Sequence, residues 1–288
     1  MNTMNKSTLP RASASCRYSP STKALGSSFY WALRLMPQAR REAMFHIYAF
    51  CREVDDIADG TDDAATKTAR LNAWRDDVES LFSGSAPTPA AECLKPVVER
   101  YALDKADMLA VIDGMQTDAH DAVRMDDEAA FDLYLDRVAS AVGRLSDKVF
   151  GVDGPAADRL AHHLGRALQI TNILRDLDED AGRNRLYLPL SLLRRHAIES
   201  DDPRTVLVHE NLIGVLSELV DRAQGHYAEA RAALVQLDRS KTRPARMMLA
   251  VYDRVLEKVQ ARGLCRSDVR VRLSKPEKLW LVLRHGML

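Results

Sequence analysis

Apolar residues recur at every third or fourth position along most of the chain, the spacing that places side chains on one face of an α-helix. The alternation of β-branched residues that is typical of strands is nearly absent. Proline and glycine interrupt the pattern at Pro37, from Gly84 to Pro89, from Gly151 to Pro155, from Gly182 to Pro189, and near Pro203. The pattern therefore predicts helices at about residues 27–35, 38–60, 64–83, 90–102, 105–120, 127–150, 156–180, 209–238, 242–262 and 276–285.

The length and composition of the chain suit a single all-α domain. The chain has 288 residues, 46% of them hydrophobic, which is enough for a sizeable core. No repeat and no long low-complexity linker divides it. The 41 basic and 41 acidic residues balance to a net charge of zero, which argues against a nucleic-acid-binding protein. The four cysteines are far apart, so we predict neither a disulfide framework nor a zinc site, and a reducing cytosol is the default compartment.

The N-terminal segment differs from the rest of the chain. Its first 23 residues lack Asp and Glu, are rich in Ser and Thr, and include four basic side chains. No apolar stretch follows these charges, so the segment is not a secretory signal. We predict a flexible basic tail over residues 1–24 and the folded domain over residues 25–288. No apolar run approaches the ~18 residues of a membrane-spanning helix, so we expect a cytoplasmic protein that at most rests on the surface of the inner membrane.

The segment RREAMFHIYAFCREVDDIADG, from Arg40 to Gly60, carries two stripes on one predicted helix. One stripe is apolar. The other contains Tyr48, Arg52, Asp55 and Asp59 at spacings of four, three and four residues. The two carboxylates lie one turn apart and repel each other, unless a cation occupies the space between them.

A second segment, LGRALQITNILRDLDED from Leu164 to Asp180, places an amide pair and a carboxylate pair on one face. These residues are Gln169, Asn172, Asp176 and Asp180, and apolar residues occupy the opposite face. Each stripe alone is common on exposed helices. Together they suggest a metal site, because both carboxylate pairs lie at helix C-termini, where the helix dipole disfavours anions. Hard oxygen ligands suit Mg²⁺, with Mn²⁺ as an alternative ion.

Arginines accompany both acidic pairs. Arg52 and Arg175 lie beside them, and Arg183 and Arg185 follow in a predicted loop. Arginine can form a bidentate fork with the diphosphate oxygens that a metal leaves free. Simple ion pairs with the carboxylates, surface solvation and compensation of the helix C-terminus are alternative interpretations of these four side chains.

These segments resemble the squalene and phytoene synthases. The resemblance lies in SSFYWALRLMP and IYAFCREVDDIAD, between residues 27 and 59, in LGRALQITNILRDLDEDAGRNRLYLP from residue 164 to 189, and more weakly in YLDRVASAVGRL from residue 134 to 145. It extends over about residues 25–260. The pair Asp136-Arg137 and the segments RPARMMLAVYDRVL and LSKPEKLWLVLRHG favour the bacterial branch of the family that makes presqualene diphosphate for hopanoid-type squalene pathways.

The resemblance implies a role for each matching residue. The metal would be bound by Asp55, Asp59, Asp176 and Asp180, with Gln169 and Asn172 completing the second site. Arg52 and Arg175 would contact the diphosphates or fix the metal-binding carboxylates. The diphosphates would also be contacted by Arg185 in a flap, and by Ser27, Ser28 and Phe29 at the entry. The reacting carbons would be faced by Tyr48, Tyr134 and Tyr227. Tyr134 and Tyr227 have an equally good interpretation as core tyrosines with a satisfied hydroxyl group.

The implied chemistry begins with ionisation of one allylic diphosphate, assisted by Mg²⁺. The double bond of a second prenyl diphosphate then attacks, and loss of a proton closes a cyclopropane. The implied substrate is farnesyl diphosphate, and the downstream enzymes of a squalene pathway are the implied partners. No NADPH is expected, because the chain has neither a G-x-G-x-x-G motif nor the C-terminal anchor of eukaryotic squalene synthases. Small residues within 138–145 could leave room for a prenyl chain, or could serve only helix packing.

Three alternatives stay open. A phytoene or dehydrosqualene synthase would use the same carboxylates on a different prenyl length or a different cation. A catalytically silent assembly or binding protein of the same fold would be expected to lose metal carboxylates, yet all four are present. A helical scaffold with acidic faces would bind no ligand in a Mg²⁺-dependent way.

Overall fold

The computed structural model describes residues 33–34, 36–84, 88–274, 276–277, 280–281 and 284. The predicted tail and three residues assigned to the diphosphate entry, Ser27, Ser28 and Phe29, lie outside the described residues. Most of the predicted helix at 27–35 lies outside them too.

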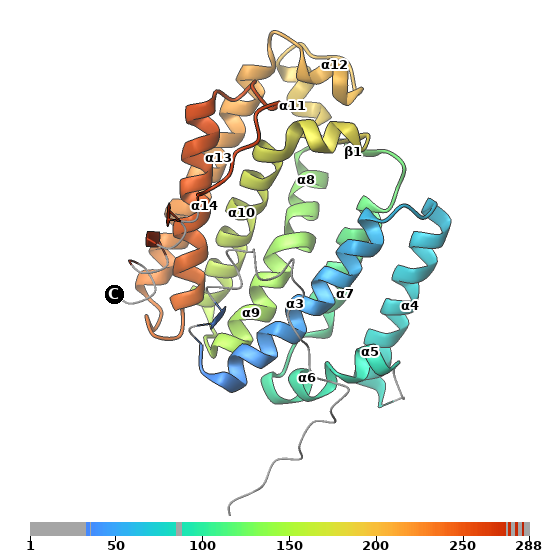
Figure 1. Ribbon diagram of the computed structural model, residues 1–288, viewed down its shortest axis with the longest axis vertical. Coiled ribbons are helices and arrows are strands. Elements are labelled where there is room, and N and C mark those ends of the chain that lie inside the picture. Colours follow the sequence, from blue (N-terminus) through green and yellow to red (C-terminus); the bar gives the residue numbers. More distant parts are fainter. Residues whose placement is uncertain are drawn as a thin grey trace, which may run out of the picture.

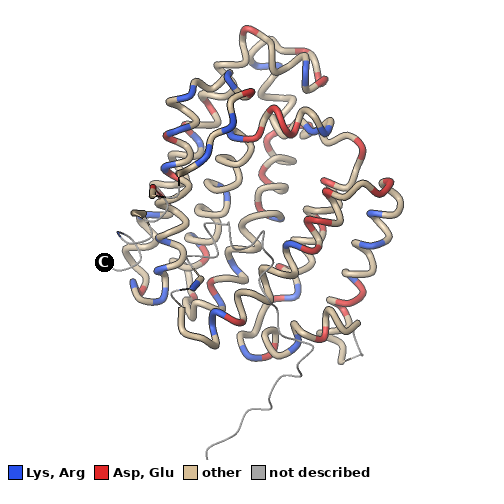
Figure 2. Tube along the Cα trace, in the orientation of Figure 1, with Lys and Arg blue, Asp and Glu red and all other residues tan. Residues whose placement is uncertain are grey.

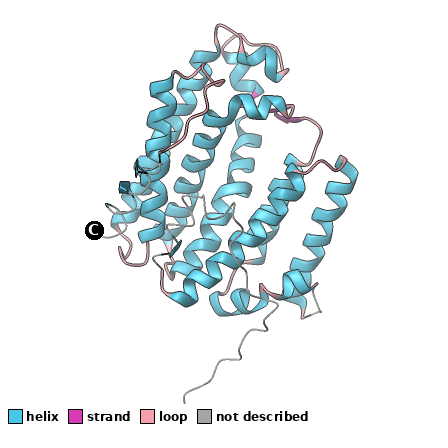
Figure 3. Ribbon diagram, in the orientation of Figure 1, coloured by secondary structure: helices cyan, strands magenta, loops and turns pink. Residues whose placement is uncertain are grey.

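Helices make up nearly all of the described fold (Figures 1 and 3). The helices before the small sheet are α3 (Gln38–Asp59), α4 (Ala64–Ser83), α5 (Pro89–Glu92), α6 (Lys95–Tyr101) and α7 (Lys105–Asp118). Strand β1 (Val123–Met125) precedes α8 (Glu128–Leu135), the π-helical turn η2 (Asp136–Ser140), α9 (Ala141–Phe150) and α10 (Pro155–Gly182). Strand β2 (Arg185–Pro189) leads to α11 (Leu190–Arg195), α12 (Pro203–Leu207), α13 (Leu212–Val235) and α14 (Arg243–Arg262). The all-α class predicted from the hydrophobic pattern is confirmed.

Local chemistry explains where several of these helices begin and end. The side chains of Asp63, Asp104 and Asp127 accept hydrogen bonds from backbone N–H groups in the first turns of α4, α7 and α8. Such caps satisfy donors that have no partner within the helix. Gly84 and Gly151 end α4 and α9 in the left-handed conformation, which glycine adopts without strain. The bounds predicted for α4 agree with the structure for this reason.

Three predictions about local structure were wrong. The helix predicted at 90–102 is two helices, because Pro96 has no N–H group to continue a helix and instead lies in the first turn of α6. The helix predicted at 127–150 contains the π-helical turn η2. The helix break predicted from Gly182 to Pro189 is confirmed, but the loop predicted to carry Arg183 and Arg185 contains β2, which pairs in parallel with β1 and places Val123 opposite Arg185.

Helix α10 lies at the centre of the packing. It packs against α13 and α14 on one side and against η2 and α9 on the other (Figure 1). Helix α7 contacts η2 and α9, and α3 and α4 pack against α7. Helix α9 contacts both α3 and α10, so the two helices that carry the acidic motifs share a neighbour. None of the described helices combines the length and apolar character needed to cross a membrane.

The described cysteines do not form a framework of bridges. Cys51 and Cys265 are free thiols, and Cys93 is disulfide-bonded. One disulfide-bonded cysteine among the described residues does not make the framework of several disulfides that stabilises small secreted domains.

Candidate active site

The first acidic motif occupies the last turns of α3. Arg52 donates to the carboxylates of Asp55 and Asp56 at 2.7 and 2.6 Å. Asp59, the last residue of the helix, accepts from Arg183 at 2.7 Å and from Arg185 at 2.8 Å. Both of these arginines follow the second acidic motif in the sequence. The fold therefore connects the two motifs through the carboxylate of Asp59.

Arg185 lies in strand β2 and not in the loop predicted from sequence. Only 9% of its surface is exposed. Its guanidinium donates to Asp59 and to the backbone carbonyls of Ala58 and Asp118. The prediction of a loop was wrong because the backbone of this segment pairs with β1. This pairing supplies backbone hydrogen bonds that the segment could not form by itself. Arg185 joins the end of α3 to the end of α7.

The second acidic motif lies on the C-terminal half of α10. Arg175 donates to both carboxylate oxygens of Asp176, at 2.8 and 2.5 Å. Asn172 donates to Oε1 of Gln169 at 3.2 Å. The Oδ1 atom of Asn172 is buried and has no hydrogen-bond partner among the described residues. A buried acceptor without a partner is costly, so this oxygen is well suited to a cation.

Both motifs contain a carboxyl group that is held in an unfavourable environment. Burial, followed by repulsion from Asp59, raises the pKa of Asp55 to about 6. Burial, followed by repulsion from Asp176, raises the pKa of Asp180 to about 7. The hydrogen bonds from Arg185 and Arg183 outweigh burial at Asp59, whose pKa lies below its usual value. Figure 2 shows this acidic character at the C-terminal ends of α3 and α10. A bound cation would relieve the repulsion at both ends.

One cavity of about 330 Å³ receives side chains from both motif helices. From α3 it is lined by Tyr48, Cys51, Arg52 and Asp55, and from α10 by Gly165, Leu168, Gln169 and Asn172. Apolar residues of α7, η2, α9 and α14 form the other walls, with Tyr252 beside them. Along both α3 and α10 the lining becomes more polar toward the C-terminal end. The cavity is therefore amphiphilic.

A second, smaller cavity of about 100 Å³ shares part of the apolar lining of the first. We call it the apolar lobe. It is lined by Ala139, Val142, Gly143, Ser146, Asp147, Phe150, Leu160, Ala161, Leu164, Gly165, Leu168, Pro244, Ala245 and Met248. Ala139, Val142, Gly165, Leu168 and Met248 line both cavities. From Leu160, in the apolar lobe, to Asn172, in the polar part, α10 rises about 18 Å.

Sequence reasoning missed a buried network beside the first motif. Asp118 accepts hydrogen bonds from the hydroxyl groups of Tyr134 and Tyr187 at 3.0 and 2.7 Å. The two tyrosine rings stack with centroids 5.0 Å apart. Burial raises the pKa of Asp118 to about 6. One signal was available, because helical spacing places Asp118 beside the apolar residues Val111 and Met115 on α7.

The tyrosines predicted to face the reacting carbons have different surroundings. Tyr48 lines the cavity. Tyr134 is 4% exposed and bonds to Asp118, so its hydroxyl is satisfied inside the protein. Tyr227 is fully buried, its hydroxyl lies 2.9 Å from that of Thr171, and it is not among the residues that line the cavity. Neither Tyr134 nor Tyr227 lines the cavity, so for both the structure favours the interpretation as core tyrosines with a satisfied hydroxyl group.

The oxygen atoms that the protein offers here suit a divalent cation only together with oxygen atoms of a bound substrate. No group of three or more His, Cys, Asp or Glu side chains within the described ranges converges on one point. Asp55, Asp180 and the free Oδ1 of Asn172 nonetheless offer hard oxygen atoms. Mg²⁺ commonly takes one or two carboxylates together with substrate phosphates, so this donor set fits a metal–diphosphate complex.

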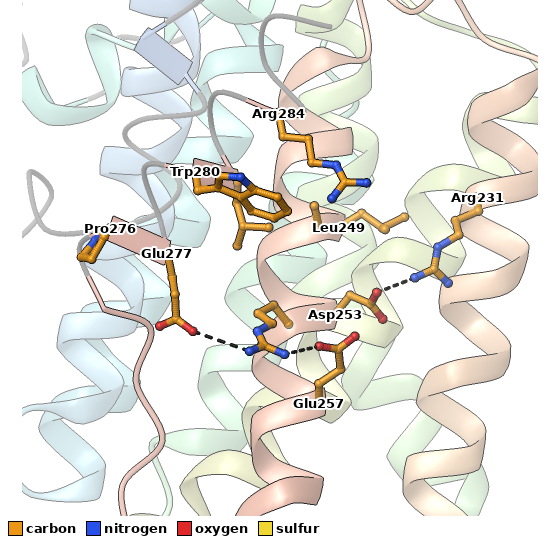
Figure 4. A pocket seen from close by; sticks show the side chains of 11 residues that line it. Arg231, Leu249, Asp253, Glu257, Pro276, Glu277, Trp280 and Arg284 are labelled. Carbon is orange, nitrogen blue, oxygen red and sulfur yellow. Dashed lines mark hydrogen bonds and ion pairs between the residues drawn. The ribbon is translucent and has the colours of Figure 1, made fainter.

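A cavity of about 860 Å³ lies elsewhere, between α13, α14 and residues near the C-terminus (Figure 4). Several of its charged side chains pair with one another. Arg231 contacts Asp253 at 2.6 Å, and Arg254 contacts Glu257 and Glu277 at 2.6 and 3.7 Å. Neither acidic motif reaches this cavity, so it does not belong to the candidate active site.

Comparison with known proteins shows the family of the chain. The sequence profile of the squalene/phytoene synthase family matches residues 22–277. The chain belongs to the squalene/phytoene synthase family. The expectations of this family, and of an enzyme of the prenyltransferase class, are therefore confirmed.

Individual members of the squalene/phytoene synthase family show how far the likeness extends. The presqualene diphosphate synthase of Rhodopseudomonas palustris is 44% identical over 265 residues, which cover 92% of this chain and 95% of the relative. The presqualene diphosphate synthase of Zymomonas mobilis is 44% identical over 262 residues, which cover 91% and 89%. The solved structure of the squalene synthase HpnC from Alicyclobacillus acidocaldarius superposes with a TM-score of 0.73 at 27% identity, covering 82% of this chain and 88% of the other.

Proposed function

We propose that the chain joins two molecules of farnesyl diphosphate head to head, forming presqualene diphosphate and releasing one diphosphate. The observation that carries the proposal is the amphiphilic cavity, which is lined by Arg52 and Asp55 of the first motif and by Gln169 and Asn172 of the second. Its polar part offers carboxylate, amide and guanidinium groups, and its apolar part shares lining residues with the apolar lobe. A prenyl diphosphate has the same division between a charged head and an apolar chain. The 44% identical relatives with this activity support the choice of product.

The reaction begins when the bond between C1 and the diphosphate oxygen of one farnesyl diphosphate breaks. The electron pair of this bond leaves with the diphosphate. The C2–C3 double bond of the second molecule attacks the allylic cation, and loss of one proton closes the cyclopropane. The second molecule keeps its diphosphate, so two substrates yield one presqualene diphosphate, one diphosphate and one proton.

The residues of both motifs would hold the leaving group. Asp55, Asp59, Asp176 and Asp180, with Asn172, would bind Mg²⁺ or Mn²⁺ together with the diphosphate oxygens. The bound ions would supply a Lewis acid that neutralises the charge of the departing diphosphate. Arg52 lines the cavity beside Asp55 and can turn its fork toward a diphosphate. Arg185 supports this end of the site by fixing the carboxylate of Asp59.

The apolar walls would protect the cation from water. Val111, Met115 and Val138 line the cavity near the polar groups and keep the alkenes in a dry environment. Tyr48 and Tyr252 line the same cavity, and an aromatic face stabilises a nearby cation. We further propose that the apolar substrate and product bring the chain into contact with the inner membrane surface and with the enzymes that consume presqualene diphosphate.

Incubation of the purified protein with farnesyl diphosphate and Mg²⁺, with and without NADPH, tests the proposal. We expect presqualene diphosphate in both samples, at the same initial rate, with one diphosphate released per two substrates consumed. Conversion of most substrate to squalene with NADPH would assign a complete squalene synthase instead. A C40 product from geranylgeranyl diphosphate, with farnesyl diphosphate inert, would assign a phytoene synthase. Absence of any Mg²⁺-dependent ligand binding would favour a scaffold.

A further inference from the structure

One carboxyl group lies in an otherwise apolar part of the molecule and has no role in the proposed chemistry. Asp147 is 6% exposed and lines the apolar lobe. Its Oδ2 atom is buried and has no hydrogen-bond partner among the described residues. Native proteins leave few buried polar atoms unpaired, because each one loses its hydration without compensation. Asp147 therefore needs an explanation.

The helical spacing of α9 places Asp147 among small and apolar side chains. Ala139, Gly143 and Phe150 lie on the same face and also line the apolar lobe. Ser146, the other polar side chain of α9 that lines the apolar lobe, donates to the carbonyl of Val142, so its hydroxyl is already used. Among the described residues that line the apolar lobe, Asp147 is thus the side chain whose polar group remains available for a hydrogen bond to a bound molecule.

The environment of Asp147 keeps its carboxyl group neutral near pH 7. Burial, followed by repulsion from Asp158 in the first turn of α10, raises the pKa of Asp147 to about 8. A neutral carboxyl is far less costly in an apolar lobe than a carboxylate. It still needs a hydrogen-bond partner such as water, which an apolar chain cannot replace.

We propose that Asp147 is a specificity-determining residue, and that its unpaired carboxyl in the apolar lobe limits the bound chain to the length of farnesyl. This inference rests on the proposed function. In this proposal a farnesyl chain ends beside Asp147 and does not displace a water that pairs with its carboxyl group. The additional isoprene unit of geranylgeranyl diphosphate displaces the water and leaves the carboxyl without a partner. Discrimination therefore comes from the polar group and not from the size of the apolar lobe alone.

Other charged groups stand at this end of the molecule and enter the pH argument. They are Lys148 on α9, Arg40 on α3, Asp158 on α10, and Lys241, Arg243 and Arg246 at the start of α14. Arg40 and Lys241 donate to the carbonyls of Phe150 and Gly151, and Arg246 donates to the carbonyl of Leu234. Of these groups, Asp158 is the one that shifts the pKa of Asp147.

The ratio of kcat/KM for geranylgeranyl and farnesyl diphosphates tests the proposal. In Asp147→Val we expect this ratio to rise about tenfold over the wild type, equivalent to about 1.4 kcal/mol. Asp147→Asn keeps a polar group and should keep the wild-type ratio. Ser146→Ala removes a lining hydroxyl that is already bonded to Val142, so it is the comparison variant and should raise the ratio much less than Asp147→Val. An unchanged ratio in folded Asp147→Val overturns the proposal.

The pH dependence of KM gives a second test that does not require Asp147→Val to fold. In the wild type, KM for farnesyl diphosphate should rise above about pH 8, with kcat unchanged, because ionisation places a charge in the apolar lobe. Asp147→Asn should remove this rise. Asp158→Asn should move it to lower pH, because loss of a like charge lowers the pKa of Asp147. A rise that persists in Asp147→Asn contradicts the proposal.

Binding measurements separate this inference from the proposed function. Thiodiphosphate analogues with C15 and C20 chains bind without turnover and can be titrated with Mg²⁺ present. If the wild type forms no product but Asp147→Val still shifts binding toward the C20 analogue, the proposed function fails and the inference stands. If the wild type binds neither analogue, both are overturned.

Discussion

The carboxylates of the two acidic motifs differ in how their charges are compensated. Asp59 is bonded by two arginines, and Asp176 is held by Arg175. Asp180 makes no ion pair within the described part of the chain, and burial and Asp176 raise its pKa to about 7. The destabilisation of the site is thus concentrated at Asp180. When an active site keeps mutually repelling charges because its function needs them, removing one of these charges can make the protein more stable.

We predict that Asp180→Asn lowers kcat with farnesyl diphosphate by at least about 100-fold, because the variant loses a carboxylate that we propose as a metal ligand. The free energy of unfolding at pH 8 should stay the same or increase, since a repelled, half-buried carboxylate is removed. Asp178→Asn on the same helix is the matched control, because Asp178 pairs with Arg204 at the surface. Steady-state kinetics and urea unfolding measure both effects. Full activity in folded Asp180→Asn would exclude this residue from the mechanism.

A dependence on pH follows from the same residue. Because the folded-state pKa of Asp180, about 7, exceeds the usual value near 4, the folded protein binds a proton more strongly than the unfolded chain does. Its contribution to stability is full below about pH 4 and is lost as pH rises through 7. In EDTA, Asp180→Asn should therefore become more stable relative to the wild type between pH 5 and pH 8. A difference that is constant over this range would contradict the raised pKa.

Among the elements, the contact between η2–α9 and α10 shapes the cavity. A Cβ atom at Gly165 would lie 2.7 Å from the backbone nitrogen of Ser140, and one at Gly143 would lie 3.0 Å from Cα of Ala161. The two glycines therefore allow the helix backbones to approach closely. Ser140 ends the π-helical turn, and such turns often occur at functional sites. The shape of the cavity wall therefore depends on how closely the backbones of η2–α9 and α10 approach each other.

Gly165→Ala should force the backbones apart, because backbone atoms of η2 cannot move as a side chain can. We expect a loss of about 1–3 kcal/mol in the free energy of unfolding and a lower kcat/KM for farnesyl diphosphate. Gly225→Ala on α13 is the control, since its Cβ would meet no atom within 4 Å. It should be neutral or stabilise the protein by up to about 1 kcal/mol. Equal stability of the two variants would show that the contact tolerates a methyl group.

At the scale of the whole molecule, the two acidic motifs belong to helices that share α9 as a neighbour, and Arg183 pairs with Asp59 of the first motif and, at 3.7 Å, with Glu179 of the second. Within the described residues, no three His, Cys, Asp or Glu side chains converge on one point, even with both motifs taken together. A metal–diphosphate complex would use donors of both. Ligands that bind only the folded protein stabilise it, by about 2.7 kcal/mol at a concentration 100 times Kd.

We therefore predict that Mg²⁺ and inorganic diphosphate together raise Tm more than the sum of their separate effects. EDTA should reverse the gain, and Asp55→Asn and Asp180→Asn should each reduce it. Differential scanning fluorimetry with each component alone provides the controls. A Tm that responds to Mg²⁺ alone as strongly as to the pair would indicate a complete metal site without diphosphate.

The sequence by itself determined the helical class, most helix bounds and the two acidic motifs. These features depend on interactions over three or four residues, which spacing in the sequence reports directly. The bounds of α4 and the stripe from Tyr48 to Asp59 are examples. Family membership followed from the same local motifs, because their residues and order are visible without the fold.

Only the tertiary structure decided which residues from distant segments meet. The pairing of β1 with β2, the bonds of Arg185 to Asp59, and the network of Asp118 with Tyr134 and Tyr187 join residues more than fifteen positions apart. The same holds for Tyr227, which packs against Thr171, and for Asp147, whose exposure to the apolar lobe depends on α10 and α14. Spacing along one helix carries no information about the helix that packs against it, so long-range packing alone could place these side chains.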